Sequence, residues 1–222
     1  EWEMAASGYA AVWAQENTRE SLFAGLKRKE TYATTGPRIT VRLFGGWDFA
    51  AEDLDRPNWV EIGYAKGVPM GGDLVTSDGA KTPAFMVSAL KDPQGANLDR
   101  VQIVKGWVTG DGETAERVYD VALSDGRRVS RRSGKAPPVG NTVDVASATY
   151  TNTIGAVELR TLWRDPDFDA SQAAFYYVRV MEIPTPRWTA YDAVFFGTEM
   201  APEVPMITQE RAYTSAIWYT PN

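Results

Sequence analysis

The stretch Glu16–Phe44, ENTRESLFAGLKRKETYATTGPRITVRLF, passes from a helical pattern to a strand pattern and decides how the rest of the chain is interpreted. Asn17 or Thr18 is a candidate N-cap, and Glu20 has capping-box spacing from Asn17. Three apolar residues then follow at helical spacing, namely Leu22, Phe23 and Leu26. Cations follow them, where they suit the negative end of a helix. This part predicts a short capped helix.

After this helix, the pattern changes to that of a strand. Gly36-Pro37 breaks the chain. Beyond it, apolar and polar residues alternate, which is typical of a strand with one buried face; the apolar ones are Ile39, Val41 and Leu43. The stretch therefore predicts a helix, an ordered turn and the first strand of a sheet.

Short apolar segments, many of them bounded by Gly, Pro or Asp, continue along the chain. The predicted strands are Gly8–Ala14, Trp59–Ala65, Pro83–Leu90, Leu98–Val108, Ala115–Leu123, Ala146–Asn152, Ala156–Trp163, Ala174–Ile183 and Ala212–Tyr219. Thr109–Glu113 reads as a hairpin turn. We expect a loop at Ser124–Asn141 and a connection with little regular structure at Thr185–Glu210. Many short strands with such turns predict a mainly β fold, an antiparallel β-sandwich.

The composition excludes several classes of function. The net charge of −6 disfavours nucleic acid or an anionic membrane as a partner. No apolar run reaches the length of a membrane span. With no His and no Cys, the chain cannot build a Ser-His-Asp triad, a thiol nucleophile or an ordinary zinc site. The lack of Cys suits the cytosol and a bacterial periplasm equally well, so the compartment is left open.

Several long motifs resemble the C-terminal part of the domain-of-unknown-function 3604 family. They are KGVPMGGDL (Lys66–Leu74), ALKDPQGANLDRVQIVKGW (Ala89–Trp107), PPVGNTVDVASATYTNTIGA (Pro137–Ala156), FYYVRVMEIPTPRWTAYDA (Phe175–Ala193) and QERAYTSAIWY (Gln209–Tyr219). The opening stretch resembles the segment that closes barrels of the polymerase-and-histidinol-phosphatase superfamily. In such relatives the metal-binding His and Asp residues lie upstream, so no catalytic residue is carried over.

The resemblance implies a division of the chain and an incomplete enzyme. Residues 1–37 would be the strand-helix remnant of an α/β barrel, and residues 38–222 an immunoglobulin-like sandwich. The partner would be the missing N-terminal barrel of the same protein, which could hold a divalent metal. This chain alone would need no cofactor and would not be catalytic. The remnant helix should pack on the sandwich through its apolar stripe or, without the barrel, leave that stripe unusually exposed.

Three alternating carboxylates, Asp165, Asp167 and Asp169, have the spacing of a calcium loop. However, Ala170 stands where an EF-hand has Gly, and Tyr176 where it has a bidentate Glu. We therefore favour an acidic turn before a strand over a calcium site.

The predicted loop contains a cluster of basic residues. They are Arg127, Arg128, Arg131, Arg132 and Lys135. It could bind phosphate or another polyanion. Gly134-Lys135 lacks the remaining P-loop residues, so a solvated loop is the favoured interpretation.

Trp47 and Trp188 are the candidate ligand-binding residues because an exposed aromatic ring can stack on a sugar. The alternative is that these rings fill the core or fix a loop. Gly71-Gly72 is better explained by a tight turn than by a ligand loop. Isolated cations that could contact an anion are Arg38, Lys66 and Arg187.

Two functions follow from the sequence. The first is an accessory, structural portion of a protein that resembles metal-dependent hydrolases. The alternative is a binding module for a carbohydrate or a protein.

Overall fold

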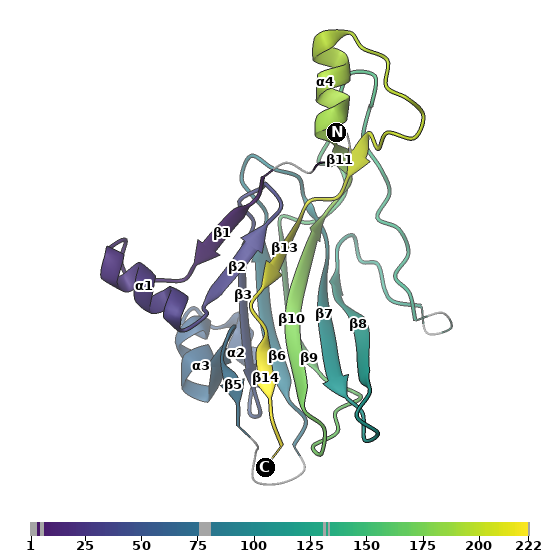
Figure 1. Cartoon of the computed structure of the whole chain (residues 1–222). Coiled ribbons are helices and arrows are strands. Elements are labelled where there is room, and N and C mark those ends of the chain that lie inside the picture. The colour runs from purple at the N-terminus through teal and green to yellow at the C-terminus, as the bar shows by residue number, and fades with distance from the viewer. Residues whose placement is uncertain (1–3, 5–6, 76–80, 131, 133, 222) are drawn as a thin grey trace.

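Two β-sheets pack face to face in the computed structural model, which describes residues 4, 7–75, 81–130, 132 and 134–221 (Figure 1). The larger sheet has eight strands and the smaller has four. A third, two-stranded sheet consists of β11 (Thr185–Pro186) and β12 (Ile207–Thr208). The fold is therefore mainly β, as the sequence predicts.

The larger sheet is organised around β10. Its strands are β1 (Tyr9–Val12), β2 (Thr31–Thr34), β5 (Asp73–Leu74), β7 (Leu98–Val108), β8 (Thr114–Leu123), β10 (Ala174–Glu182), β13 (Arg211–Thr214) and β14 (Ile217–Tyr219). β7 pairs with β10 along one edge and carries β8 beyond it. β13 and β14 follow each other along the opposite edge of β10. β2 and β1 extend the sheet from β13, and β5 joins β14 in a parallel pair.

The smaller sheet lies behind the larger one and encloses the main core. Its order is β4 (Gly67–Pro69), β3 (Thr40–Gly46), β6 (Ala84–Leu90) and β9 (Glu158–Arg164), all antiparallel. Alternate side chains of both sheets point between them, as strand geometry requires. The core includes Val41, Leu43, Phe85, Val87, Ile103, Tyr176, Val178 and Ile217, all almost fully buried.

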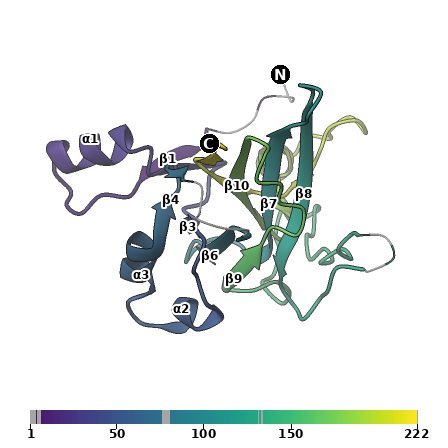
Figure 2. The same cartoon turned by 90° about the horizontal axis from the view of Figure 1, so that it is seen from below.

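Two helices, α2 (Ala51–Asp55) and α3 (Trp59–Lys66), cover the other face of the smaller sheet (Figure 2). A second apolar cluster fills this space and contains Phe44, Phe49, Leu54, Ala84 and Met86. The Phe44 ring meets Trp59 and Tyr64 edge-on, at centroid distances of 5.9 and 5.0 Å. The sandwich thus gains a helical layer on one side.

The two remaining helices lie at the periphery (Figure 1). α1 (Arg19–Lys27) connects β1 to β2, which form an antiparallel pair, and α4 (Trp188–Phe196) projects from one end of the sandwich. The N-cap of α1 is Thr18, whose hydroxyl accepts a hydrogen bond from the Ser21 amide. Both helices therefore leave much of their surface outside the two packed sheets.

Several predicted elements are confirmed. β7 has the predicted bounds, while β1, β3, β6, β8, β9 and β10 lie within two residues or so of theirs. Thr109 and Glu113 close the β7–β8 hairpin through a backbone hydrogen bond. Gly36-Pro37 lies between β2 in the larger sheet and β3 in the smaller one. The two-domain division, the barrel remnant and the immunoglobulin-like topology stay predictions.

Four predicted segments differ from the structure. Trp59–Ala65 is helix α3, since a short apolar run does not distinguish helix from strand. Ala146–Asn152 forms a turn in which only Thr149 makes a bridge, to Asp144. Thr185–Glu210 contains α4 as well as β11 and β12. Ala212–Tyr219 is divided at Ser215-Ala216, where the chain's hydrogen bonds go to Thr31 and Gly71 instead of β10.

The predicted packing of α1 onto the sandwich through its apolar stripe is also wrong. Phe23 is 66% exposed and Leu26 is 56% exposed. The buried residue of α1 is Gly25, which faces Val12 at the end of β1 and the following residue, Trp13. Phe23 and Leu26 are thus unusually exposed, whereas Leu22 is half-buried.

Candidate functional site

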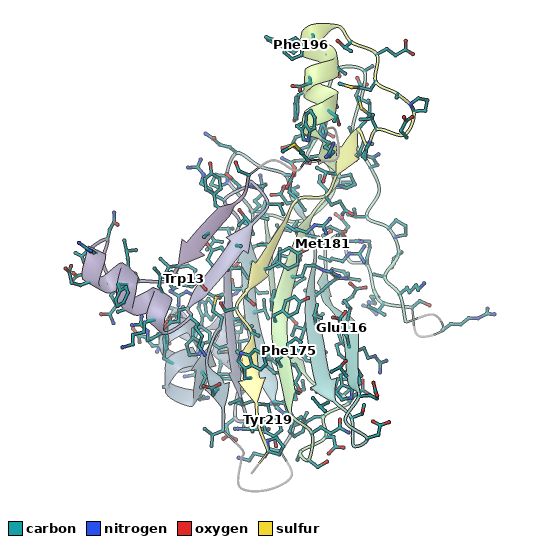
Figure 3. The ribbon with its side chains drawn as sticks, viewed as in Figure 1. Trp13, Glu116, Phe175, Met181, Phe196 and Tyr219 are labelled. Atoms are coloured by element: carbon teal, nitrogen blue, oxygen red, sulfur yellow. The ribbon has the colours of Figure 1, made fainter. Side chains whose placement is uncertain are left out.

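An aromatic groove lies on the outer face of the larger sheet. We define it by Gly106, Glu116, Phe175 and Trp218, which occupy one row across β8, β7, β10 and β14. The Phe175 and Trp218 rings lie 5.3 Å apart and are tilted by 48°. The groove has a volume of about 410 Å³ and mainly apolar walls. Figure 3 shows Phe175 and Glu116 on the same sheet.

Gly106 allows the Phe175 ring to lie flat across β7. A Cβ atom at this glycine would stand 2.3 Å from Cζ of Phe175, far inside van der Waals contact. Any larger residue would therefore lift the ring away from the sheet. Tyr177, two residues further along β10, stacks beside Phe175 with an interplanar angle of 11°. The result is a flat aromatic surface on a rigid central strand.

The rim of the groove is polar. Glu116 is exposed on β8, and burial together with the charge of Glu116 raises the pKa of Tyr177. Two threonines, Thr114 and Thr220, also line the groove. The apolar surface ends towards the middle of β10, where two polar residues follow on the same face. They are Arg179 and Gln102, and Arg179 donates a 2.7 Å hydrogen bond to Gln102. The groove therefore combines an aromatic floor with carboxylate and hydroxyl groups at its edge.

A second apolar surface, the α1 surface, comprises the exposed Phe23 and Leu26 and the half-buried Leu22. A groove of about 560 Å³ runs between this helix and the neighbouring strands. Its walls include Val12, Leu22, Leu26, Tyr32 and Tyr213, so they are largely apolar. This surface is separate from the aromatic groove.

The three aspartates of the predicted acidic turn serve different partners. Asp165 is fully buried and accepts hydrogen bonds from Lys105 Nζ at 2.6 Å and from the Tyr176 hydroxyl at 2.7 Å. Asp167 accepts from Arg117 and Tyr119, while Asp169 accepts from Ser171 in a local turn. The Lys105 ammonium thus already neutralises Asp165, and the three carboxylates do not converge.

This acidic turn fixes two tyrosines as neutral donors. Burial, followed by the neighbouring aspartate charges and hydrogen bonds, raises the pKa of Tyr176 and of Tyr119. Lys105 lies between the sheets, and its Nζ is 5.3 Å from the centroid of the Trp107 ring. The arrangement is a buried polar network that joins β7, β10 and the turn before β10.

One arginine of the basic cluster, Arg127, differs from the solvated loop that the sequence predicts, because its side chain is largely buried. Arg127 forms an ion pair of 2.5 Å with Asp99, and its side chain is only 10% exposed. It also donates to the carbonyl oxygens of Ser124 and Pro137. Arg128, Arg132 and Lys135 are exposed, and Arg131 lies outside the described residues. Arg127 therefore anchors the loop to the sheet.

Trp47 and Trp188 lie away from the aromatic groove's exposed floor. Trp47 is half-buried, packs against Phe168 and Tyr219, and donates its indole N–H to Val75. Trp188 begins α4 and donates to the Met4 carbonyl oxygen. Neither prediction includes Phe175 or Trp218. The consecutive aromatic residues in FYYV (Phe175–Val178) are a signal for Phe175, because a strand places Phe175 and Tyr177 on one face and Tyr176 on the other.

The other singled-out residues have local partners. Lys66 pairs with Asp53 at 2.6 Å, Arg38 lies 3.8 Å from Asp92, and Arg187 donates to Met4. Gly71 has a φ of +85°, which confirms the tight turn. Within the described part of the chain, no three acidic side chains are grouped to hold a metal.

Comparison with protein families shows to which family the chain belongs. The family described as "Protein of unknown function (DUF3604)" matches residues 1–221. The chain belongs to this family. No curated protein and no solved structure matches it. The relation to metallohydrolase barrels and the C-terminal placement within the family stay predictions.

The DUF3604 match spans both the aromatic groove and the α1 surface. Among the described residues of this DUF3604 chain, no helix is long and apolar enough to cross a membrane.

Proposed function

We propose that this chain is a non-catalytic accessory portion of a metal-dependent hydrolase, in which the α1 surface packs against a metallohydrolase-like barrel of the same protein. The barrel would supply the metal-binding His and Asp residues, and it would act on a phosphoester or a related bond. The immunoglobulin-like sandwich would stabilise the barrel and form one wall of its site.

The exposure of the α1 surface carries this proposal. A nine-residue helix is marginal by itself in water and is normally stabilised by burying one apolar face. Here Phe23 and Leu26 point outward, and an apolar groove lies beside them. Contiguous exposed apolar surface of this kind is typical of a docking site. The resemblance of Glu16–Phe44 to a barrel-closing segment supports the barrel as the partner.

Activity measurements test the non-catalytic role. With Mn²⁺, Mg²⁺ or Zn²⁺ added, this chain should not hydrolyse bis-p-nitrophenyl phosphate above the metal-only rate. Metal-dependent hydrolysis by the chain itself would contradict the proposal.

Paired substitutions test the docking role in the longer protein that we propose. Phe23→Ser with Leu26→Ser should lower the melting temperature of the barrel, because the apolar contact is lost. Phe196→Ser is the matched control, since Phe196 on α4 is 68% exposed and Phe23 is 66% exposed. Equal melting temperatures in both variants would exclude α1 as the docking site.

A binding module for a carbohydrate or a protein is the second candidate function. The aromatic groove favours it, because Phe175 and Trp218 form an accessible aromatic surface at the end of a rigid sheet. The ligand-binding residues that the sequence predicts are tested by Trp47→Ala and Trp188→Ala on a glycan array. Unchanged binding and stability in both variants would leave these two residues without a role in recognition.

A further inference from the structure

The aromatic groove has the chemistry of a site for an amphipathic ligand. Trp218 is 48% exposed beside Phe175, so the floor offers ring faces to solvent. An aromatic face carries a partial negative charge and attracts the weakly positive C–H groups of an aliphatic ring. A flat ligand with C–H groups on one face would match this floor.

The rim selects among such ligands. Glu116 can accept hydrogen bonds from hydroxyl groups, and Thr114 and Thr220 line the same groove. A purely apolar ligand would remove water from the exposed Glu116 carboxylate and would offer no hydrogen bond in its place. An anionic ligand would be repelled by Glu116 and by the net charge of −6. A neutral ring with several hydroxyl groups satisfies both the floor and the rim.

The geometry points to a binding site for neutral pyranose saccharides in the aromatic groove, with Phe175 and Trp218 as stacking platforms and Glu116 as a hydroxyl acceptor. This inference rests on the binding-module function given above and is independent of docking through α1. Gly106 is the positioning residue, because any side chain there would displace the Phe175 ring.

Isothermal titration with neutral oligosaccharides tests the site directly. The probes are cellohexaose, maltohexaose and mannohexaose, with hexagalacturonate as the anionic arm. We expect at least one neutral probe to bind and hexagalacturonate to bind at least tenfold more weakly. Trp218→Ala should weaken binding of the neutral probe at least tenfold, and Glu116→Gln should weaken it to a smaller degree.

The controls separate recognition from folding. Phe196→Ala removes an exposed aromatic ring elsewhere and should leave binding unchanged. Urea unfolding should give Glu116→Gln the same midpoint as the unmodified chain. Trp218→Ala, which loses its contact with Phe175, should still unfold in one cooperative transition. Gly106→Ala should reduce binding by displacing Phe175.

Two results would overturn the inference. One is that no neutral probe binds, and the other is that Trp218→Ala binds as well as the unmodified chain. Tighter binding of hexagalacturonate would also contradict the assignment to neutral sugars. Saccharide binding that survives Phe23→Ser with Leu26→Ser would support the groove irrespective of the outcome for α1, so the two proposals can fail separately.

Discussion

At the scale of single residues, buried charge is the most consequential feature of this protein. Lys105 and Asp165 lie between the two sheets with side chains 4% and 0% exposed. Their attraction offsets a large cost of removing both charges from water. Asp165 also accepts hydrogen bonds from the Tyr176 hydroxyl and the Asp167 amide, so both of its carboxylate oxygens have hydrogen-bond partners.

Lys105→Met should destabilise the chain by about 3–5 kcal/mol, because Asp165 would stay buried without its counter-charge. Arg117→Met is the control, since Arg117 pairs with Asp167 of the same turn but is 59% exposed. That change should cost less than about 1 kcal/mol. Urea unfolding measures both, and equal losses would refute the assigned importance of the buried pair.

Glu182 predicts an unusual dependence of stability on pH. Burial, followed by the charges of Glu210 and Asp92, raises the pKa of Glu182 to about 8. Its Oε1 atom has no hydrogen-bond partner among the described residues. An unfolded Glu titrates near pH ~4.3, so the folded state holds its proton more tightly. The contribution of Glu182 to stability is then complete below pH ~4.3 and is lost as the pH rises to about 8.

Glu182→Gln should remove this loss, because the amide keeps the shape of the neutral acid and does not titrate. The measurement is the free energy of unfolding in urea at pH 5, 6, 7 and 8. Glu158→Gln, whose side chain is 48% exposed, should retain the decline with pH. A variant at position 182 that declines as steeply as the unmodified chain would show that another group is responsible.

At the scale of elements, short apolar segments bounded by turn residues predict most of the long strands, and the prediction fails where tertiary contacts decide. β10 alternates between buried and half-buried residues, whereas β7 is buried on both faces over most of its length. The sequence of α3 resembles that of a strand, and its close packing on β3 depends on Gly63, where a Cβ would stand 2.6 Å from the Phe44 ring. No local signal gives that contact.

The same limit applies to the candidate site. Trp47 and Trp188 were selected from local sequence, but exposure of a ring depends on its neighbours in space. The aromatic groove joins four strands, and its row of residues requires the registers of β8, β7, β10 and β14. The need for glycine at position 106 is visible only in the structure, where the Phe175 ring lies against it.

Thr18→Ala should loosen α1 without unfolding the sandwich. Loss of the N-cap hydrogen bond to Ser21 costs about 1 kcal/mol, which corresponds to roughly fivefold faster amide exchange in α1. Hydrogen exchange measured by mass spectrometry should show the change in α1 and not in β10. Faster exchange in both elements would show that α1 unfolds together with the sheets.

Arg127→Met should release the loop that follows β8, because Arg127 joins Asp99 of β7 to Pro137. Limited proteolysis should cut this loop faster in the variant. Arg128→Met is the matched control, since the neighbouring Arg128 is exposed, and its cleavage rate should equal that of the unmodified chain. Equal rates in the two variants would show that Arg127 does not hold the loop.

At the scale of the whole molecule, the two proposed surfaces occupy different regions. The α1 surface lies beside the antiparallel pair β1 and β2, whereas the aromatic groove crosses β8, β7, β10 and β14 (Figure 1). A barrel docked on α1 would therefore leave the groove's strands to a second partner. The two proposals therefore concern separate parts of the fold.

The central claim, that α1 is a docking surface for a barrel, is tested most directly by labelling a cysteine at position 23. The chain has no native cysteine, so Phe23→Cys introduces a single thiol into it. Maleimide labelling of that peptide, followed by mass spectrometry, should be fast in this chain alone and at least tenfold slower in the longer protein with its barrel. Phe196→Cys should be labelled rapidly in both. Equal labelling rates for position 23 in the two proteins would contradict the account.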